Sequence, residues 1–276
     1  VCSSDLIYGM IESALLWYSL YSDVLQQEGF IINKLDKCVA NKVINGKQCT
    51  IGWYVDDNIM GHEDPEVMTG VLSKIEKHFP GLVIQRGKVL DFLGINIKFR
   101  DDGKVDLDTI PYLKGMIEDF EEEIGTKLTR EYVSPAGAWL FKVNDDTAAL
   151  DTKKADIMRK YVMKVAWAMK RSRPDVELAT SFLMTRVSKP DKDDWHKLLR
   201  LMSFIKQTVS DVRTIGADSL IDMLTMVDSS HAVHKDMRGH TGGIISFGTG
   251  VIDTKASKQK MNTRSSTETE HVGTSE

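Results

Sequence analysis

Hydrophobic and polar positions in the first sixty residues predict one helix followed by a meander of strands. Apolar residues recur near the helical period over residues 8–27, and the aromatic residues of this stretch are assigned to a core. Residues 37–43 and 47–55 have the composition of strands and flank Asn45-Gly46, the strongest short hairpin signal. Residues 58–61 are expected to return as a third strand. This part of the chain is therefore predicted to place a rigid antiparallel sheet beside a helix.

The rest of the pattern alternates between helices and hairpins. A helix is predicted over residues 65–79, with Asp64 as its cap. Residues 92–99 are predicted to form one strand, which Asp102-Gly103 turns into a second strand over residues 104–107. The other expected elements are helices over residues 111–124, 155–171, 175–188 and 191–209, an irregular connector over 130–150, a strand over 220–227 ending at Asp228, a hairpin of 242–247 and 251–256, and a helix capped by Ser266 or Thr267. This order of elements predicts an α+β fold.

Composition limits the class of protein. The chain has 276 residues, of which 42% are hydrophobic and 28% charged, as expected for globular domains with sizeable cores. No apolar run approaches the ~20 residues that a membrane helix needs. The three cysteines, Cys2, Cys38 and Cys49, lack metal-ligand spacing and favour a reduced, intracellular protein. Because the chain begins with Val1 and its first six residues fit nothing that follows, we expect a piece of a longer polypeptide with a foreign start.

Charge is distributed unevenly along the chain. The net charge is −4, but residues 152–213 carry 15 Lys and Arg against 7 Asp and Glu. Six basic residues and no acidic one lie within residues 158–173: Arg159, Lys160, Lys164, Lys170, Arg171 and Arg173. A dense positive surface in an acidic chain is what contact with a phosphate backbone requires, but a solvated helix face explains the same residues. The acids within residues 118–123 are assigned to a solvated face.

Two adjacent carboxylates, Asp56 and Asp57, lie at the tip of the hairpin that ends the predicted meander. Neighbouring carboxylates repel one another unless a cation neutralises them, and hard oxygen ligands suit Mg²⁺ bound to substrate phosphates. The pair is therefore a candidate two-metal site for phosphoryl transfer. Asp-Asp also occurs at residues 101–102, 145–146 and 193–194, where a turn, a polar loop and a helix start explain it. The dipeptide alone does not establish a catalytic site.

Short motifs along the chain, taken in order, resemble one known family. Those of the first half are Tyr8-Gly9, Trp17-Tyr18, Tyr54-Val55-Asp56-Asp57 and Phe92-Leu93-Gly94-Ile95. Those of the second half are Arg173-Pro174-Asp175, Trp195, Val227-Asp228, Ser257-Lys258 and Ser265-Ser266-Thr267-Glu268-Thr269-Glu270. From about residue 7 to its end, the chain resembles the Pol polyprotein of copia-type LTR retrotransposons, in which a reverse transcriptase is followed by a ribonuclease H domain.

The resemblance implies three parts. Residues 1–100 correspond to the later part of a polymerase palm, an antiparallel sheet with packed helices. Residues 101–218 correspond to a helical, basic thumb and connection, and residues 219–276 to the start of a ribonuclease H-like α/β domain. In such polymerases, palm carboxylates hold two Mg²⁺ or Mn²⁺ ions. Asp56 and Asp57 correspond to two of these catalytic ligands and a third lies upstream in the family, so the isolated chain is expected not to polymerise.

The same resemblance implies the contacts with nucleic acid and the ribonuclease H acids. Nucleic acid is expected to meet Tyr54, the primer-holding residues Phe92, Leu93 and Gly94, and the six basic residues Arg159, Lys160, Lys164, Lys170, Arg171 and Arg173. Asp228 and Glu270 correspond to the first two acids of a second two-metal site. The implied partners are an RNA template, a DNA primer, RNA–DNA hybrid, deoxynucleoside triphosphates and other parts of the polyprotein. No membrane partner is expected. The expected location is intracellular, in a cytoplasmic virus-like particle, the nucleus or both.

Departures from the family pattern leave alternatives open. Ile11 and Leu15 stand where the family usually has a basic or polar residue, and His271 stands where Tyr is usual. The alternatives are a decayed copy that only binds nucleic acid, and a nuclease whose chemistry depends on the two ribonuclease H acids alone. A zinc site with Asp228 is a further possibility: His231, His234 and His240 are close in sequence. Because no Cys is near and the His-x-x-His spacing is short, a surface loop is favoured.

Overall fold

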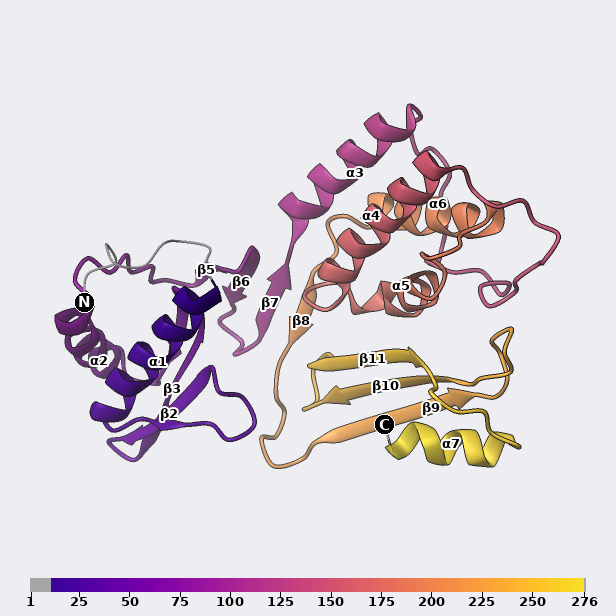
Figure 1. Ribbon diagram of the computed structural model, residues 1–276. Coiled ribbons are helices and arrows are strands. Elements are labelled where there is room, and N and C mark those ends of the chain that lie inside the picture. Colours follow the sequence, from indigo (N-terminus) through magenta and orange to yellow (C-terminus); the bar gives the residue numbers. More distant parts are fainter. Residues whose placement is uncertain (1–10, 276) are drawn as a thin grey trace. The chain divides into compact units, whose positions relative to one another are not determined.

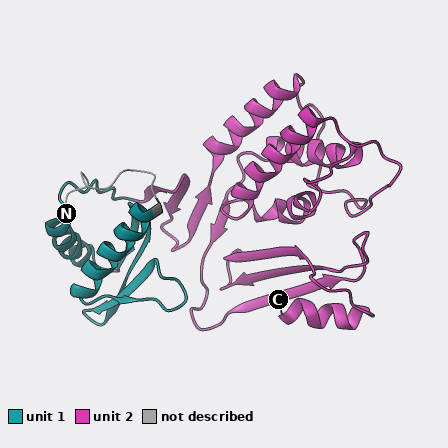
Figure 2. Cartoon of the chain, viewed as in Figure 1, with its two compact units in different colours: residues 1–87 teal, residues 88–276 magenta. Residues whose placement is uncertain are grey.

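The computed structural model describes residues 11–275, and the chain divides into two compact units (Figure 1, Figure 2). The first unit ends at Gly87, and the second begins at Lys88. The motif Tyr8-Gly9, the first six residues and the start of the first predicted helix lie outside the described residues. The predicted boundaries at residues 100 and 218 stay predictions.

In the first unit, two helices pack on an antiparallel sheet. Its elements in chain order are α1 (Ile11–Gln27), β1 (Ile31–Ile32), β2 (Val39–Ile44), β3 (Lys47–Tyr54), β4 (Asp57–Gly61) and α2 (Pro65–His78). The strands follow the order β1-β2-β3-β4. Leu25 of α1, Ile51 and Trp53 of β3, and Ile75 of α2 share one buried core. The predicted helices and strand meander are confirmed.

Local signals in the sequence position this meander. Asn45 and Gly46 have φ values of 53° and 77°, the left-handed conformation that a tight hairpin turn needs. The Asp64 side chain accepts a hydrogen bond from Glu66 N at 2.8 Å and so caps α2. The turn and the cap therefore fix β2, β3 and α2. The next hairpin, between β3 and β4, begins with a strand that is already held by this sheet.

The second unit begins with a small antiparallel sheet. It contains β5 (Val89–Phe92), β6 (Ile95–Phe99), β7 (Val105–Asp108) and β8 (Arg213–Ile215), in that order. The single strand predicted over residues 92–99 is wrong, because Leu93 and Gly94 form a two-residue turn between β5 and β6. Their φ values are 54° and 73°. The sequence pattern does not reveal this turn. A turn of two residues leaves the alternation of apolar and polar positions unbroken from β5 to β6, and Leu93 is not a residue type that is typical of turns.

Helices from the middle of the chain share one core. They are α3 (Ile110–Ile124), α4 (Thr152–Met169), α5 (Glu177–Met184) and α6 (Lys192–Gln207), with a short 3-10 helix η2 (Pro174–Val176) before α5. Fully buried Phe120, Tyr161, Phe182 and Leu198 each come from a different one of these helices. The predicted helices are confirmed, and the connector between α3 and α4 has no helix or strand, as expected.

The predicted solvated face of α3 is confirmed for the other four acids, which are exposed, but it is wrong for Glu121. Glu121 is buried, and its carboxylate accepts hydrogen bonds from Lys206 Nζ and Leu128 N, both at 2.7 Å. Lys127 Nζ lies 2.9 Å from the other oxygen of this carboxylate. The sequence does not reveal this arrangement, because Lys206 comes from α6, far along the chain.

Glu121 is expected to make stability depend on pH. Burial raises the pKa of Glu121, but hydrogen bonds from Lys206, Lys127 and Leu128 outweigh burial and lower the pKa to about 2. The stability it contributes is present above the ordinary glutamate pKa of ~4.3 and is lost as the pH falls toward 2. The free energy of unfolding, measured with urea near pH 7 and near pH 3, should therefore fall less in Glu121→Gln than in the wild type. An equal fall in both proteins would contradict this, and exposed Glu122→Gln is the control.

The last part of the second unit is a three-stranded sheet with a helix packed on it (Figure 1). Its elements are β9 (Leu224–Ser230), β10 (His240–Ser246), β11 (Asp253–Lys258) and α7 (Ser266–Ser275), and the strand order is β11-β10-β9. The helix approaches the sheet closely, because a Cβ on Gly273 would meet the Ser229 hydroxyl. The predicted hairpin of β10 and β11 is confirmed. No helix within residues 11–275 has the length and apolar character to cross a membrane.

Two details of this sheet differ from the prediction. The first strand does not end at Asp228 but continues to Ser230, so Asp228 lies inside β9. The cap of α7 is neither Ser266 nor Thr267, because Ser265 Oγ accepts the hydrogen bond from Glu268 N at 3.2 Å. Both differences concern the ends of elements, which sequence patterns locate only to within one or two residues.

β9 forms an open edge of this sheet. Among the described strands it pairs only with β10. The residues that lead into β9 and its first half expose several apolar side chains: Leu220, Ile221, Met223, Leu224 and Met226.

Candidate functional site

The two adjacent carboxylates lie at the turn between β3 and β4. Tyr54 pairs with Asp57, so Val55 and Asp56 are the two residues of the turn. Val55 has a φ of 55°, a strained conformation for a β-branched residue. Asn58 Nδ2 donates a hydrogen bond to the Asp56 carbonyl oxygen at 2.8 Å. The turn therefore holds both acidic residues on a defined backbone rather than on a loose loop.

Trp17 of α1 supports this turn from the side. Its indole Nε1 donates a hydrogen bond to the Val55 carbonyl oxygen. The Trp17 ring stacks on Tyr21 with the ring centroids 5.8 Å apart and meets Phe79 at 5.1 Å. Sequence reasoning assigned the aromatic residues of α1 to the core and missed this contact. The available signal was the indole N–H, which usually needs a partner when the ring is packed.

Both carboxylates are exposed. Among residues 11–275, neither the Asp56 nor the Asp57 carboxylate has a recorded hydrogen bond or ion pair. Two neighbouring carboxylates without a protein cation fit a divalent ion, because Mg²⁺ prefers hard oxygen ligands. Within the same residues, no group of three or more His, Cys, Asp and Glu side chains could hold a metal ion. Asp56 and Asp57 therefore offer part of a ligand set, which phosphates, water or a further carboxylate would have to complete.

The residues predicted to hold the primer lie at the β5–β6 turn of the second unit. Phe92 ends β5 and is half-buried, as is Leu93, whereas Gly94 is exposed. The turn therefore presents backbone rather than a large polar side chain. Tyr54, the other predicted contact, belongs to the first unit and is exposed there.

Glu270, one of the two predicted ribonuclease H acids, contacts the strand that carries the other one, Asp228. Glu270 on α7 is half-buried, and its Oε1 accepts a hydrogen bond from Ser229 N at 3.3 Å. Ser229 follows Asp228 in β9, and Asp228 is exposed. The Glu270 carboxylate therefore lies at the Ser229 peptide group, but Ser229 is the residue whose side chain faces α7, and the Asp228 side chain alternates to the other face of the strand.

Most of the predicted basic phosphate contacts form ion pairs inside the second unit. Lys160 Nζ lies 2.8 Å from Glu123, Lys164 Nζ lies 2.9 Å from Asp119, and Arg159 Nη1 lies 2.6 Å from Asp156. Lys170 pairs with Glu177, and it also donates to the Thr254 carbonyl oxygen of β11 at 2.8 Å. Much of the positive charge of α4 is therefore balanced by acids of the same unit.

The two arginines after α4 have different surroundings. Arg173 is 1% exposed and donates hydrogen bonds to both Asp175 carboxylate oxygens, at 2.9 and 2.7 Å. It also donates to the Thr208 carbonyl oxygen at 3.0 Å. Arg171 is half-buried and lies over the Trp167 ring, 4.2 Å from its centroid. Arg173 therefore has a structural role in this conformation, whereas Arg171 keeps part of its surface open.

Two of the three histidines near β10 do not lie on the surface loop that the sequence favours. His234 and His240 are buried, with His234 Nε2 3.0 Å from His240 Nδ1. Burial lowers the pKa of each of them to about 4, so both are neutral near pH 7. His231 Nδ1 instead lies 2.9 Å from Thr269 Oγ1. His234 and His240 are parts of a packed core, whereas His231 is exposed, and within residues 11–275 none of the three belongs to a metal-binding group.

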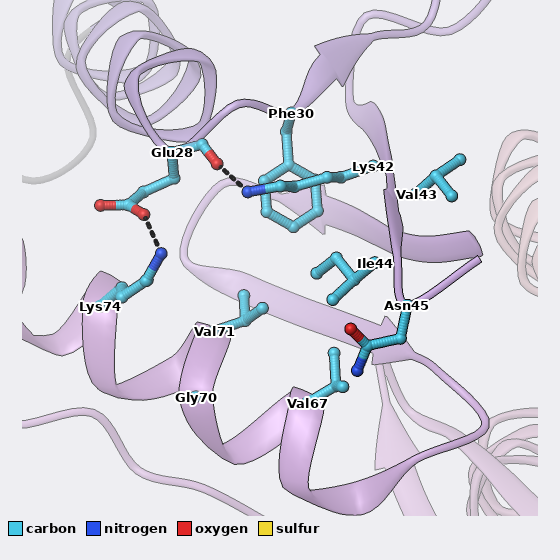
Figure 3. Close-up of a pocket in the computed structure, with 10 residues that line it drawn as sticks. All are labelled: Glu28, Phe30, Lys42, Val43, Ile44, Asn45, Val67, Gly70, Val71 and Lys74. Atoms are coloured by element: carbon cyan, nitrogen blue, oxygen red, sulfur yellow. Dashed lines mark hydrogen bonds and ion pairs between the residues drawn. The ribbon is translucent and has the colours of Figure 1, made fainter. Parts of the chain in front are cut away.

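A hollow of about 440 Å³ lies between α2 and the β2–β3 hairpin (Figure 3). Glu28 engages both nearby ammonium groups, since Lys42 Nζ donates to its carbonyl oxygen at 2.5 Å and Lys74 Nζ lies 3.1 Å from its carboxylate. The remaining lining is Phe30, Val43, Ile44, Asn45, Val67, Gly70 and Val71. The hollow contains none of the predicted site residues.

Comparison with known proteins bears on the first half of the chain. Residues 3–134 match the family described as reverse transcriptase (RNA-dependent DNA polymerase). This segment is similar to reverse transcriptases. It contains the β3–β4 turn with both exposed carboxylates and the β5–β6 turn. The match ends in the connector after α3, so it does not reach Asp228 or Glu270.

Relatives extend the similarity beyond the reverse transcriptase-like segment. A protein attributed to transposon Ty5-1 of Saccharomyces cerevisiae is 24% identical over 273 residues, 98% of this chain and 86% of that protein. The retrovirus-related Pol polyprotein from transposon TNT 1-94 of Nicotiana tabacum is 22% identical over 98% of this chain. The chain spans only 20% of that polyprotein. An uncharacterised mitochondrial protein of Arabidopsis thaliana is 24% identical over 79% of this chain and 87% of its own length. No solved structure matches the chain significantly.

Proposed function

We propose that this chain is part of an RNA-directed DNA polymerase from a copia-type LTR retrotransposon polyprotein. The single observation that carries the proposal is the β3–β4 turn. It lies inside the segment that matches reverse transcriptases, and it presents two exposed neighbouring carboxylates that have no protein partner within residues 11–275. A site for magnesium and nucleotide phosphates needs such unpaired oxygen ligands on a fixed backbone.

Asp56 and Asp57 are the catalytic residues in this proposal. Their carboxylates would hold Mg²⁺ or Mn²⁺, and Asn58 and Trp17 keep the turn between them in place. Two bound ions would supply activation of the primer 3′-hydroxyl and neutralisation of the leaving pyrophosphate. Among the described residues there is no third carboxylate to complete the group, so the 276-residue chain by itself is expected to be inactive as a polymerase.

Each unit would contact nucleic acid through its own residues. Tyr54 and the turn formed by Leu93 and Gly94 would contact the primer and template, and the half-exposed basic residues of α4 would contact duplex phosphates. The ion pairs of Lys160 and Lys164 with α3 reduce the charge available for this contact. A modest salt dependence of duplex binding follows, because fewer counterions are released.

The sheet of β9–β11 with α7 would be the start of a ribonuclease H domain. Asp228 and Glu270 would hold its metal ions. The support is that Glu270 of α7 accepts a hydrogen bond from β9, the strand that carries Asp228. This activity would cut the RNA strand of the hybrid that the polymerase makes, with water as the nucleophile.

Primer extension by the full-length protein tests the proposal. With Mg²⁺, an RNA template and a DNA primer, we expect template-directed incorporation that stops when the metal is chelated. Salt-sensitive binding to duplex without synthesis would instead support a decayed copy. Cleavage of RNA–DNA hybrid without synthesis, lost in Asp228→Asn, would support the nuclease alternative.

A further inference from the structure

Trp167 of α4 lies at the turn between β5 and β6. Its ring atoms Cη2 and Cζ2 lie 3.6 and 3.8 Å from the position that a Cβ on Gly94 would occupy. Gly94 has a φ of 73°, which glycine adopts without strain. The flat edge of the indole therefore packs directly against the backbone of the turn. The contact lies within the second unit and joins a helix to a hairpin more than sixty residues earlier in the chain.

The Trp167 ring is itself held by neighbours on two helices and the following turn. Tyr112 of α3 meets it with the ring centroids 4.4 Å apart, and the Tyr112 hydroxyl donates to the Lys164 carbonyl oxygen at 3.0 Å. The Arg171 guanidinium lies 4.2 Å from the ring centroid, and its Nη1 donates to the Trp167 carbonyl oxygen at 3.0 Å. Stacking and cation–π contacts of this kind add to the burial of the ring. The indole is therefore a fixed support rather than a mobile surface group.

A second contact attaches the same sheet to the end of α4. The Thr109 and Ser172 hydroxyl oxygens lie 2.6 Å apart, and both side chains are buried. Thr109 follows β7, and β7 pairs with β6. The sheet is thus fixed at one end by Thr109 and at its β5–β6 turn by Trp167. Arg213 of β8 also donates to the Arg171 carbonyl oxygen at 3.0 Å, so without Trp167 the sheet would stay attached at β7 and β8 while the β5–β6 turn lost its support.

We infer that Trp167 is a positioning residue that holds the Leu93-Gly94 turn against α4 and thereby places the primer end. The inference rests on the proposed function, in which this turn contacts the primer. Trp167 acts through the turn, because the ring edge packs on the Gly94 backbone and the ring also contacts Tyr112 and Arg171. A displacement of about 1 Å between reacting groups can cost about a hundredfold in rate, so a fixed turn is valuable.

Three variants of the full-length protein test the role of Trp167. Trp167→Ala removes the support, Trp167→Phe keeps an aromatic ring in the stack, and Trp195→Ala is the matched control. Trp195 lies on α6. Its ring contacts Phe120 of the same helical core, with the ring centroids 6.2 Å apart, and Lys154 of α4, rather than the turn. Each variant is assayed for the rate of single-nucleotide incorporation at saturating nucleotide, for the Kd of primer–template, and for hydrogen exchange of the peptide over residues 89–99.

For Trp167→Ala we expect a fall of about tenfold or more in the incorporation rate with the Kd changed by less than about threefold. Hydrogen exchange over residues 89–99 should accelerate in this variant, and Trp167→Phe should recover most of the rate. Trp195→Ala should lose stability but keep the rate per folded molecule. If the rate and the exchange of Trp167→Ala equal those of Trp195→Ala, the role of Trp167 is overturned while the polymerase proposal stands. A wild-type protein that incorporates nothing would overturn the polymerase proposal itself, and with it a role in placing the primer.

Discussion

Replacing Asp56 or Asp57 by asparagine is expected to lower nucleotide incorporation by the full-length protein by roughly a thousandfold, or about 4 kcal/mol of transition-state stabilisation. Asparagine keeps the size of the side chain but removes the negative charge that a divalent ion requires. Since both side chains are exposed and have no recorded partner among the described residues, folding should be unchanged. The measurement is the rate of single-nucleotide addition, with the melting temperature followed in parallel.

The chain supplies a matched control for this loss of charge. Asp145 and Asp146 are another exposed Asp-Asp pair, in the connector between α3 and α4. Asp145→Asn and Asp146→Asn should leave the rate within about threefold of the wild type, because surface charges away from a site have small effects. Incorporation by Asp56→Asn and Asp57→Asn at the wild-type rate would remove the β3–β4 turn from the proposed chemistry.

Replacing Arg173 by alanine is expected to destabilise the 276-residue chain by about 3 kcal/mol or more. The guanidinium is 1% exposed and joins the Asp175 carboxylate to the carbonyl oxygen of Thr208 at the end of α6. Its removal leaves the half-buried Thr208 carbonyl oxygen and the Asp175 carboxylate without their donors and empties the buried space that the guanidinium fills. Urea unfolding followed by circular dichroism measures the loss.

Arg159→Ala is the comparison within the same basic stretch. Arg159 pairs with Asp156 on the surface of α4, and such exposed pairs contribute about 0–1 kcal/mol. Arg159→Ala should therefore unfold close to the wild-type urea midpoint, while its affinity for duplex falls slightly. Equal stabilities for the two variants, with weaker duplex binding by Arg173→Ala, would restore Arg173 to the predicted phosphate contacts.

Elements with local signals could be predicted from the sequence, and those that depend on distant partners could not. Asn45-Gly46 and Asp64 fix their hairpin and helix through their own backbone and side chain, so the first unit was predicted closely. The Leu93-Gly94 turn could not be predicted in the same way, because Leu93 adopts a positive φ that leucine rarely adopts.

Ion pairs between distant parts of the chain also could not be predicted from the sequence. Counting basic residues over α4 gives a positive face, but the count cannot show that Glu123 and Asp119 of α3 lie opposite Lys160 and Lys164. Pairing across 37 or 45 residues of chain exists only after the helices have packed. The candidate carboxylates were found because they are adjacent in sequence, whereas the Trp17 contact with Val55 spans 38 residues and was not found.

The free side of β9 has a practical consequence for work with this protein. A strand with open N–H and C=O groups and apolar neighbours such as Leu224 and Met226 can join the same strand of another molecule. Concentrated samples of the isolated chain would then contain assemblies joined through β9. Binding assays are therefore best carried out with dilute protein or with the chain fused to a solubility tag. Ser229 N limits this side reaction at one point, because its hydrogen is already donated to Glu270.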